Sequence, residues 1–197
     1  MLGNMMKDQL LISGILEHAI QNNSKTEVVS NTIEGGLHRY TILDSAKRSK
    51  QLANALTSIG IKKGDVIGTI AVNGYRHLEL YFGVSGIGAV LHTLNPRLFP
   101  EHVEYIINHA EDKYIFVDAP FLPIIEGVFE KLKTVKGVIV LAAKKDIPES
   151  KIENLICYEE LISKESTEIN WPELDEHTAS SLCYTSGTTG NPKGALY

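Results

Sequence analysis

Short apolar runs alternate with helix-forming stretches along the middle of the chain, and this alternation constrains the fold more than any other feature. Strands are expected at residues 66–72, 89–94, 114–118 and 138–142, with helices at residues 78–86, 100–109 and 121–132 between them. Short β-branched strands joined by helices form parallel sheets whose two faces are both covered. The pattern therefore predicts an α/β fold, a layered and parallel-rich sheet with helices on both faces.

The residues before this alternation predict a helix, a hairpin and a second helix. Apolar residues recur at helical spacing from Leu11 to Ile20, which indicates an amphipathic first helix. Residues 27–31 and 37–41 read as a β-hairpin because Gly35 and Gly36 separate them. Thr41 can cap the next helix with Asp44 three residues later, and that helix is expected to end at Gly60.

The last third of the chain is less regular. Residues 143–150 form a polar, charged connection, and residues 158–163 predict one short helix. The rest of segment 153–175, with the single tryptophan, Trp171, is interpreted as a linker or an edge of the fold. An apolar stretch at residues 179–184 then leads into a loop rich in glycine and hydroxyl groups.

Charge and cysteine content exclude several classes of function. The chain has 19 Lys and Arg residues against 24 Asp and Glu residues, so it offers no general attraction for nucleic acid. Its two cysteines, Cys157 and Cys183, lack the spacing of a zinc site or a disulfide framework. Residues 10–16 are too short an apolar run for a membrane span or a signal peptide. These features predict a cytoplasmic protein without a transmembrane segment, which would meet a lipophilic substrate from the aqueous side or at a membrane surface.

The chemistry is concentrated in residues 184–194, which read Tyr-Thr-Ser-Gly-Thr-Thr-Gly-Asn-Pro-Lys-Gly. Glycine lets backbone N–H groups approach phosphate oxygens, and hydroxyl groups add further short donors. Lys193 supplies a compact positive charge beside them. This combination is typical of a loop that binds phosphate.

Two other interpretations of the loop are weaker. The common P-loop does not fit, because Pro192 stands five residues after Gly187 and no Gly-Lys-Ser/Thr sequence follows. A polar surface loop would explain the serines, threonines and glycines separately, but not their order together with Pro-Lys-Gly. Phosphate binding outside the P-loop class is the better interpretation.

The loop resembles the phosphate-binding motif of the AMP-binding superfamily of adenylate-forming enzymes, which includes acyl-CoA synthetases. Residues 88–98, read Gly-Ala-Val-Leu-His-Thr-Leu-Asn-Pro-Arg-Leu, are similar to the medium- and long-chain fatty acyl-CoA synthetase branch. The similarity continues through residues 104–112 and 116–118, and it spans essentially the whole chain. The resemblance implies the N-terminal part of the adenylate-forming fold.

The resemblance also implies an activity, its cofactors and its site residues. Such enzymes are acid–thiol ligases in which a carboxylate attacks the α-phosphate of MgATP, after which CoA displaces AMP to form the thioester. By this resemblance Thr185 helps to hold Mg²⁺, and Lys193 has a catalytic role. The residues expected to bind the ATP phosphates are Thr185, Ser186, Gly187, Thr188, Thr189, Gly190 and Lys193. Each charge-assisted contact would contribute roughly 1.5–3 kcal/mol.

The expected domain organisation is an incomplete one. Residues 1–197 are expected to be an incomplete N-terminal AMP-binding domain that ends just after the phosphate-binding loop, 185–194, with the C-terminal domain absent. Activity would then belong to the complete polypeptide, and the 197 residues alone would be inactive. Two alternatives stay open: a truncated, non-catalytic phosphate-binding fragment, and an adenylating enzyme with an acceptor other than CoA. The acyl chain length and the oligomeric state also stay open, although related synthetases include homodimers.

Several other residues of chemically active types are expected to be structural. His92, at a strand end, is interpreted as a hydrogen-bonded structural histidine. His102 and His109 lack the HExxH arrangement of a zinc site and are expected to be exposed or capping groups. Cys183 is expected to be a buried packing thiol, because no histidine neighbours it in the sequence.

Overall fold

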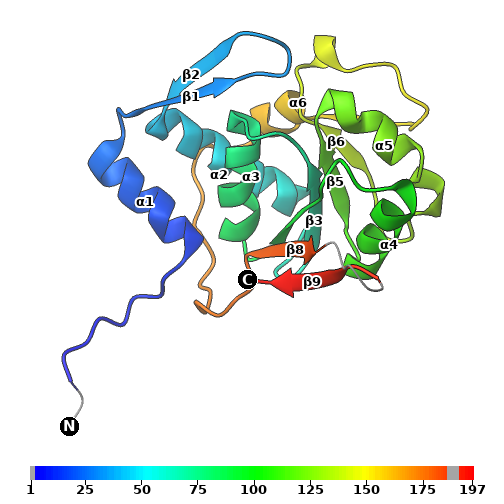
Figure 1. The fold of residues 1–197 in the computed structure, drawn as a ribbon. Coiled ribbons are helices and arrows are strands. Elements are labelled where there is room, and N and C mark those ends of the chain that lie inside the picture. Colours follow the sequence, from blue (N-terminus) through cyan, green and yellow to red (C-terminus); the bar gives the residue numbers. More distant parts are fainter. Residues whose placement is uncertain (1–2, 186–190) are drawn as a thin grey trace.

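The structure, a computed structural model, describes residues 3–185 and 191–197. It has a main sheet with the strand order β7-β6-β5-β3-β4-β8-β9 and a separate hairpin of β1 and β2 (Figure 1). All neighbouring strands of the main sheet are parallel except β8 and β9, which are antiparallel. The predicted parallel-rich α/β fold is confirmed. The strands of the main sheet are β3 (Val66–Ile70), β4 (Val90–Thr93), β5 (Tyr114–Val117), β6 (Val138–Val140), β7 (Ile156–Cys157), β8 (Ser181–Thr185) and β9 (Lys193–Leu196).

The first elements follow the sequence pattern closely. Helix α1 (Ile12–Asn23) precedes the hairpin of β1 (Glu27–Asn31) and β2 (Leu37–Thr41), and α2 (Ile42–Ser58) follows it. The expected capping box is present: the Thr41 hydroxyl accepts a hydrogen bond from the Asp44 amide, and the Asp44 carboxylate accepts one from the Thr41 amide. Gly60 follows α2 with φ +89°, a left-handed conformation that favours glycine.

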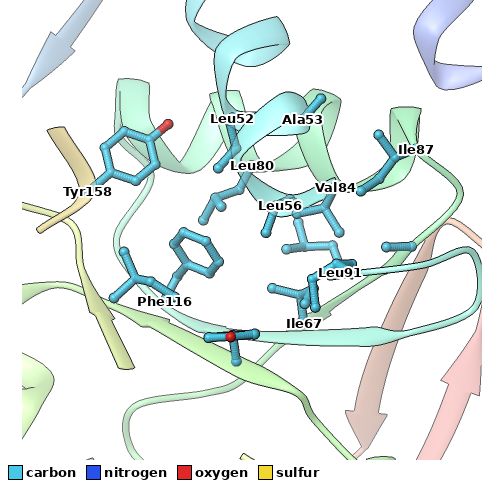
Figure 2. Close-up of a cluster of buried hydrophobic side chains, with 14 of the residues drawn as sticks. Leu52, Ala53, Leu56, Ile67, Leu80, Val84, Ile87, Leu91, Phe116 and Tyr158 are labelled. Atoms are coloured by element: carbon cyan, nitrogen blue, oxygen red, sulfur yellow. The ribbon is translucent and has the colours of Figure 1, made fainter. Parts of the chain in front are cut away.

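Helices cover both faces of the main sheet, and each face has its own core. On one face, α2 packs with α3 (Tyr75–Gly86) and α6 (Tyr158–Ser163). Figure 2 shows how leucine and valine side chains of α2 and α3 lie over buried strand residues, namely Leu52, Leu56, Leu80 and Val84 over Ile67, Leu91 and Phe116. On the other face, α4 (Pro100–Ala110) and α5 (Leu122–Glu126) cover the strand residues that alternate with these. The buried strands therefore have apolar side chains on both faces, as parallel sheets require.

A cluster of charged side chains lies within the first of these cores. The Arg48 guanidinium is 2.7 Å from one Glu79 carboxylate oxygen and 2.9 Å from a Glu159 oxygen. Glu79 has no exposed side-chain surface, and its second oxygen accepts a hydrogen bond of 2.6 Å from the Tyr158 hydroxyl. Burial raises the pKa of Glu79, and the adjacent Arg48 offsets part of that rise. The cluster joins α2, α3 and α6 at one place.

The helix predicted at residues 121–132 differs from the structure, whereas segment 153–175 agrees with one of its two interpretations. The helix expected at residues 121–132 is a 3₁₀ turn at Ala119–Phe121, a short α5 and a second 3₁₀ turn at Phe129–Lys131. Pro123 stands in the first turn of α5, where proline is tolerated, and the helix ends at Glu126 because the next residue, Gly127, disfavours a helix interior. The segment interpreted as a linker or an edge contains the edge strand β7, and Trp171 packs against the first core. A third 3₁₀ turn, Lys144–Asp146, lies in the polar connection.

A close contact between Gly86 and Trp171 gives a test of this packing. A Cβ atom at Gly86 would lie 2.4 Å from Cζ3 of Trp171, whose indole N–H donates to Glu17 over 2.9 Å. We expect Gly86→Ala to lower the free energy of unfolding by about 1–3 kcal/mol, because the ring must move. Urea unfolding followed by far-UV circular dichroism measures this change.

The matched control is Gly14→Ala in α1, where a Cβ atom would meet nothing within 4 Å. Alanine favours helix more than glycine does, so this variant should be unchanged or more stable by up to about 1 kcal/mol. Equal stability of the two variants would show that the Trp171 ring does not restrict position 86.

Candidate phosphate-binding site at the carboxyl edge of the sheet

Strand β8 carries the predicted loop to the carboxyl edge of the parallel sheet. Because β8 is parallel to β4, its last residue, Thr185, lies at the same edge as the ends of β3, β4 and β5. Ligands of open parallel sheets bind in crevices at this edge. The chain then returns along the antiparallel strand β9 (Figure 1). The loop is therefore held between two paired strands of the main sheet.

The two predicted site residues that the structure describes are neighbours. Thr185 and Lys193 are paired in the register of β8 and β9, and the Thr185 hydroxyl donates to the Lys193 carbonyl over 3.3 Å. Both residues are exposed. The other predicted phosphate-binding residues, Ser186, Gly187, Thr188, Thr189 and Gly190, lie outside the described residues. The roles of all seven stay predictions, including Mg²⁺ binding by Thr185 and catalysis by Lys193.

Tyr184, just before the loop, has contacts that the sequence analysis did not foresee. Its hydroxyl lies 2.6 Å from Nδ1 of His109 in the last turn of α4, and its ring centroid lies 5.1 Å from that of His92 in β4. In the β8–β9 pair Tyr184 lies opposite Gly194. The only sequence signal for this arrangement was the pairing of an aromatic residue with a glycine. That pairing can be recognised only when β9 is known to be a strand.

Behind Tyr184, His92 forms a buried pair with Asp112. Neither side chain has any exposed surface, and His92 Nδ1 is 2.9 Å from an Asp112 carboxylate oxygen. Burial raises the pKa of the Asp112 carboxyl, and the hydrogen bond with His92 offsets part of this rise. Gly68 in β3 leaves room for the pair, since a Cβ atom there would lie 2.8 Å from Asp112 Oδ2. His92 is the hydrogen-bonded structural histidine that the sequence analysis expects.

The other residues interpreted as structural are placed as follows. His109 is exposed, as expected, and contacts Tyr184. Cys183 is half-buried, so the expectation of a buried thiol was wrong; its Sγ lies 3.2 Å from the Thr93 hydroxyl of the neighbouring strand. Within residues 3–185 and 191–197, no three His, Cys, Asp or Glu side chains are grouped as a metal site would require.

Asp118 marks the point of the carboxyl edge where neighbouring connections diverge. After β3 the chain crosses to β4 on one side, and after β5 it crosses to β6 on the other. At this point the Asp118 carboxylate accepts a hydrogen bond of 2.8 Å from the Val72 amide. Burial raises the pKa of Asp118 to about 6, although the Val72 amide and Arg76 act in the opposite direction.

The raised pKa of Asp118 predicts a pH dependence of stability. An unfolded Asp titrates near pH 4, so between about pH 4 and pH 6 the folded protein binds more protons and its stability falls as pH rises. Asp118→Asn keeps an oxygen acceptor for Val72 but cannot ionise. Urea unfolding measures the free energy of unfolding of the variant relative to the wild type. We expect this difference to favour the variant more at about pH 7 than at about pH 4.

Asp44 provides a control of opposite sign. The hydrogen bond with the Thr41 side chain is the largest influence on its carboxyl and lowers the pKa. Its stabilising effect is therefore present above the unfolded pKa and is lost as pH falls. Asp44→Asn should be more destabilising at neutral pH than at acidic pH. If both variants showed the same pH trend, the assignment of a raised pKa to Asp118 would be wrong.

The fold and the position of the loop together define a class of protein. It is an open α/β protein with a mostly parallel sheet, in which a segment rich in glycine and hydroxyl residues connects β8 to β9. Residues 16–197 match the sequence profile of the family described as AMP-binding enzyme. The chain belongs to this family.

Curated relatives match the whole chain. It is 46% identical over 197 residues to 3-methylmercaptopropionyl-CoA ligase of Ruegeria pomeroyi and 47% identical over 197 residues to medium-chain-fatty-acid–CoA ligase of Ectopseudomonas oleovorans. It is also 40% identical over 193 residues to long-chain-fatty-acid–CoA ligase of Thermus thermophilus. These alignments cover 98–100% of this chain and 34–36% of the relatives. The chain thus spans about a third of their length.

Solved structures show the same fold. The anthranilate CoA ligase AuaEII, in complex with anthranoyl-AMP, aligns with a TM-score of 0.85 at 23% identity, over 98% of this chain and 35% of that one. The N-terminal domain of FACL13 from Mycobacterium tuberculosis aligns with a TM-score of 0.80 at 23% identity, over 95% of this chain and 44% of that one. The expected adenylate-forming fold is confirmed.

Proposed function

We propose that the polypeptide containing this chain is an ATP-dependent acyl-CoA synthetase that activates a carboxylic acid. A carboxylate oxygen attacks the α-phosphorus of ATP, an acyl-adenylate forms and pyrophosphate leaves. The thiol of CoA then attacks the acyl carbon, AMP leaves and the thioester forms. The observation that carries this proposal is the Thr-Ser-Gly-Thr-Thr-Gly-Asn-Pro-Lys-Gly sequence between two paired strands at the carboxyl edge of the sheet. The names of the three CoA ligases that match the whole chain support it.

The described geometry suits this role. Thr185 and Lys193 face each other across the start of the hairpin, so a hydroxyl and an ammonium group flank the loop at its two ends. In the proposed reaction Lys193 and residues 186–190 bind the β- and γ-phosphates and neutralise the charge that develops on the departing pyrophosphate. Thr185 would help to hold Mg²⁺, which would supply positive charge to neutralise the phosphates. Hydroxyl oxygen and phosphate are suitable ligands for this hard cation.

Domain organisation, location and assembly are part of the same proposal. We propose that residues 1–197 form an incomplete AMP-binding domain and that the rest of the polypeptide supplies the remaining catalytic machinery, including a C-terminal domain; the chain covers 36% of two relatives' length. Among the residues that the structure describes, no helix combines the length and the apolar composition needed to cross a membrane. We retain the prediction of a cytoplasmic location, in which a lipophilic acid is met from the aqueous side or at a membrane surface; the oligomeric state stays open, with a homodimer as one alternative.

Acid-dependent exchange of pyrophosphate into ATP tests the proposal. The full-length protein should catalyse exchange with at least one acid of a panel that spans 3-methylmercaptopropionate, octanoate and palmitate. Lys193→Ala should lower the exchange rate roughly 10²–10³-fold, the loss seen when one group that stabilises transition-state charge is removed. Lys25→Ala, an exposed lysine in the connection between α1 and β1, is the matched control and should retain full activity.

Each other outcome of this assay has a definite meaning. Exchange without thioester formation in the presence of CoA would indicate an acceptor other than CoA. Exchange by residues 1–197 alone would contradict the proposal that the rest of the polypeptide is required. Absence of exchange from the full-length protein with every acid would contradict adenylation and favour a non-catalytic phosphate-binding protein.

A further inference from the structure

Tyr184 contacts both the core and the strand that leaves the phosphate-binding loop. It lies in β8 directly before Thr185, and its ring packs against the core formed with α4 and α5. A Cβ atom at Gly194 would lie 3.2 Å from Cζ of this ring, so the strand that leaves the loop passes directly over Tyr184. The side chain is thus in contact with the entry strand and the exit strand at once.

This contact determines which residues of the loop face each other. Because Tyr184 pairs with Gly194, Thr185 pairs with Lys193. A shift of one residue in strand register moves every side chain to the opposite face of a sheet. A register shift would place a residue larger than glycine opposite Tyr184. Its side chain would meet the ring, so the shift is disfavoured. The proposed phosphate-binding groups therefore depend on the position of Tyr184.

The Tyr184 ring is in turn fixed by two histidines from different elements. His92 lies under it and is held by the buried bond to Asp112. Nδ1 of His109 and the Tyr184 hydroxyl form a hydrogen bond of 2.6 Å. The His109 ring also stacks on Tyr105, with a centroid distance of 5.3 Å. Burial raises the pKa of the Tyr184 hydroxyl, so it remains protonated and can donate at neutral pH.

Core packing does not require the hydrogen bond between the Tyr184 hydroxyl and His109. The ring alone fills the space against Gly194 and His92, and phenylalanine would fill it equally. His109 is exposed, so water could satisfy both polar groups if the bond were absent. A precise bond between the residue before the loop and a rigid helix is a means of holding a binding site in one geometry.

We propose that Tyr184 is a positioning residue for the β- and γ-phosphates of ATP, and that His109 orients Tyr184 through its hydroxyl. Tyr184 acts through Thr185 and Lys193 and does not itself touch the nucleotide. This inference rests on the proposed function. It predicts a defect confined to ligands that reach the loop, because AMP lacks the two phosphates that the loop would bind.

The test is the affinity of the full-length protein for ATP and for AMP, measured by isothermal titration calorimetry. Tyr184→Phe and His109→Leu should each weaken ATP binding by about 2- to 12-fold, the equivalent of one net hydrogen bond. AMP binding should be unchanged in both variants. The double variant should be no weaker than either single variant, because the two side chains act through one bond.

Two further variants separate positioning from general structure. His109→Asn should restore ATP affinity, because the Asn amide places a polar atom near the position of Nδ1. Tyr81→Phe is the matched control: Tyr81 in α3 is 42% exposed, and it should leave both affinities unchanged. If Tyr184→Phe folds poorly, the comparison of His109→Leu with His109→Asn decides the question alone.

Two results would overturn the inference. Wild-type ATP affinity in Tyr184→Phe and His109→Leu would show that the hydroxyl bond has no role in phosphate binding. An equal loss of ATP and AMP affinity would show a general structural effect and not a role in positioning the β- and γ-phosphates. Failure of the proposed function is distinguishable, because the wild-type protein itself would then catalyse no exchange, whatever its affinity for the two nucleotides.

Discussion

The pairing of β4 with β8 is the contact on which the candidate site depends. It joins residues far apart in the sequence: the Thr93 hydroxyl and the Cys183 thiol, 90 positions apart, lie 3.2 Å from each other. Closing so long a segment costs conformational entropy, which must be offset by contacts made only in the folded chain. The Leu91 amide and the Ser85 hydroxyl both donate to the Ser180 carbonyl, which anchors the start of β8. Without this pairing the loop would have no fixed position at the carboxyl edge.

The two cores support this pairing in different ways. One face is apolar apart from the cluster around Arg48 and Glu79, which joins three helices through charged groups. Removing one partner of such a buried pair costs about 3–5 kcal/mol, because the other charge is left without compensation. The second face contains the His92–Asp112 pair, with His92 next to the Tyr184 ring. This pair lies against the sheet, whereas the charged cluster lies between helices.

Local signals predicted much of the fold. The Thr41–Asp44 capping box and the Gly35-Gly36 turn each depend on a few neighbouring residues, so the sequence contained the complete information. Strand β7 has only two residues and is extended because it pairs with β6. Strand β9 reads Lys-Gly-Ala-Leu, which has no strand signal of its own and is extended because it pairs with β8.

The candidate site shows the same division between local and distant information. The loop sequence alone predicts Thr185 and Lys193 as candidate phosphate-binding residues, because the order of glycine, hydroxyl and lysine residues is itself the signal. Tyr184 and His109 are 75 positions apart, and nothing in the sequence near either one indicates the other. Such pairs become visible only when the strand order and the packing of α4 are known. Contacts between residues so far apart in the sequence are therefore harder to predict than a local motif.

The most direct test of the account is a crystal structure of the full-length protein with Mg²⁺ and a non-hydrolysable ATP analogue. The account predicts that the β- and γ-phosphates lie in the turn between β8 and β9, with Nζ of Lys193 at hydrogen-bond distance from a phosphate oxygen and the Tyr184–His109 bond intact. Phosphates bound away from this turn, with Lys193 directed into solvent, would contradict it.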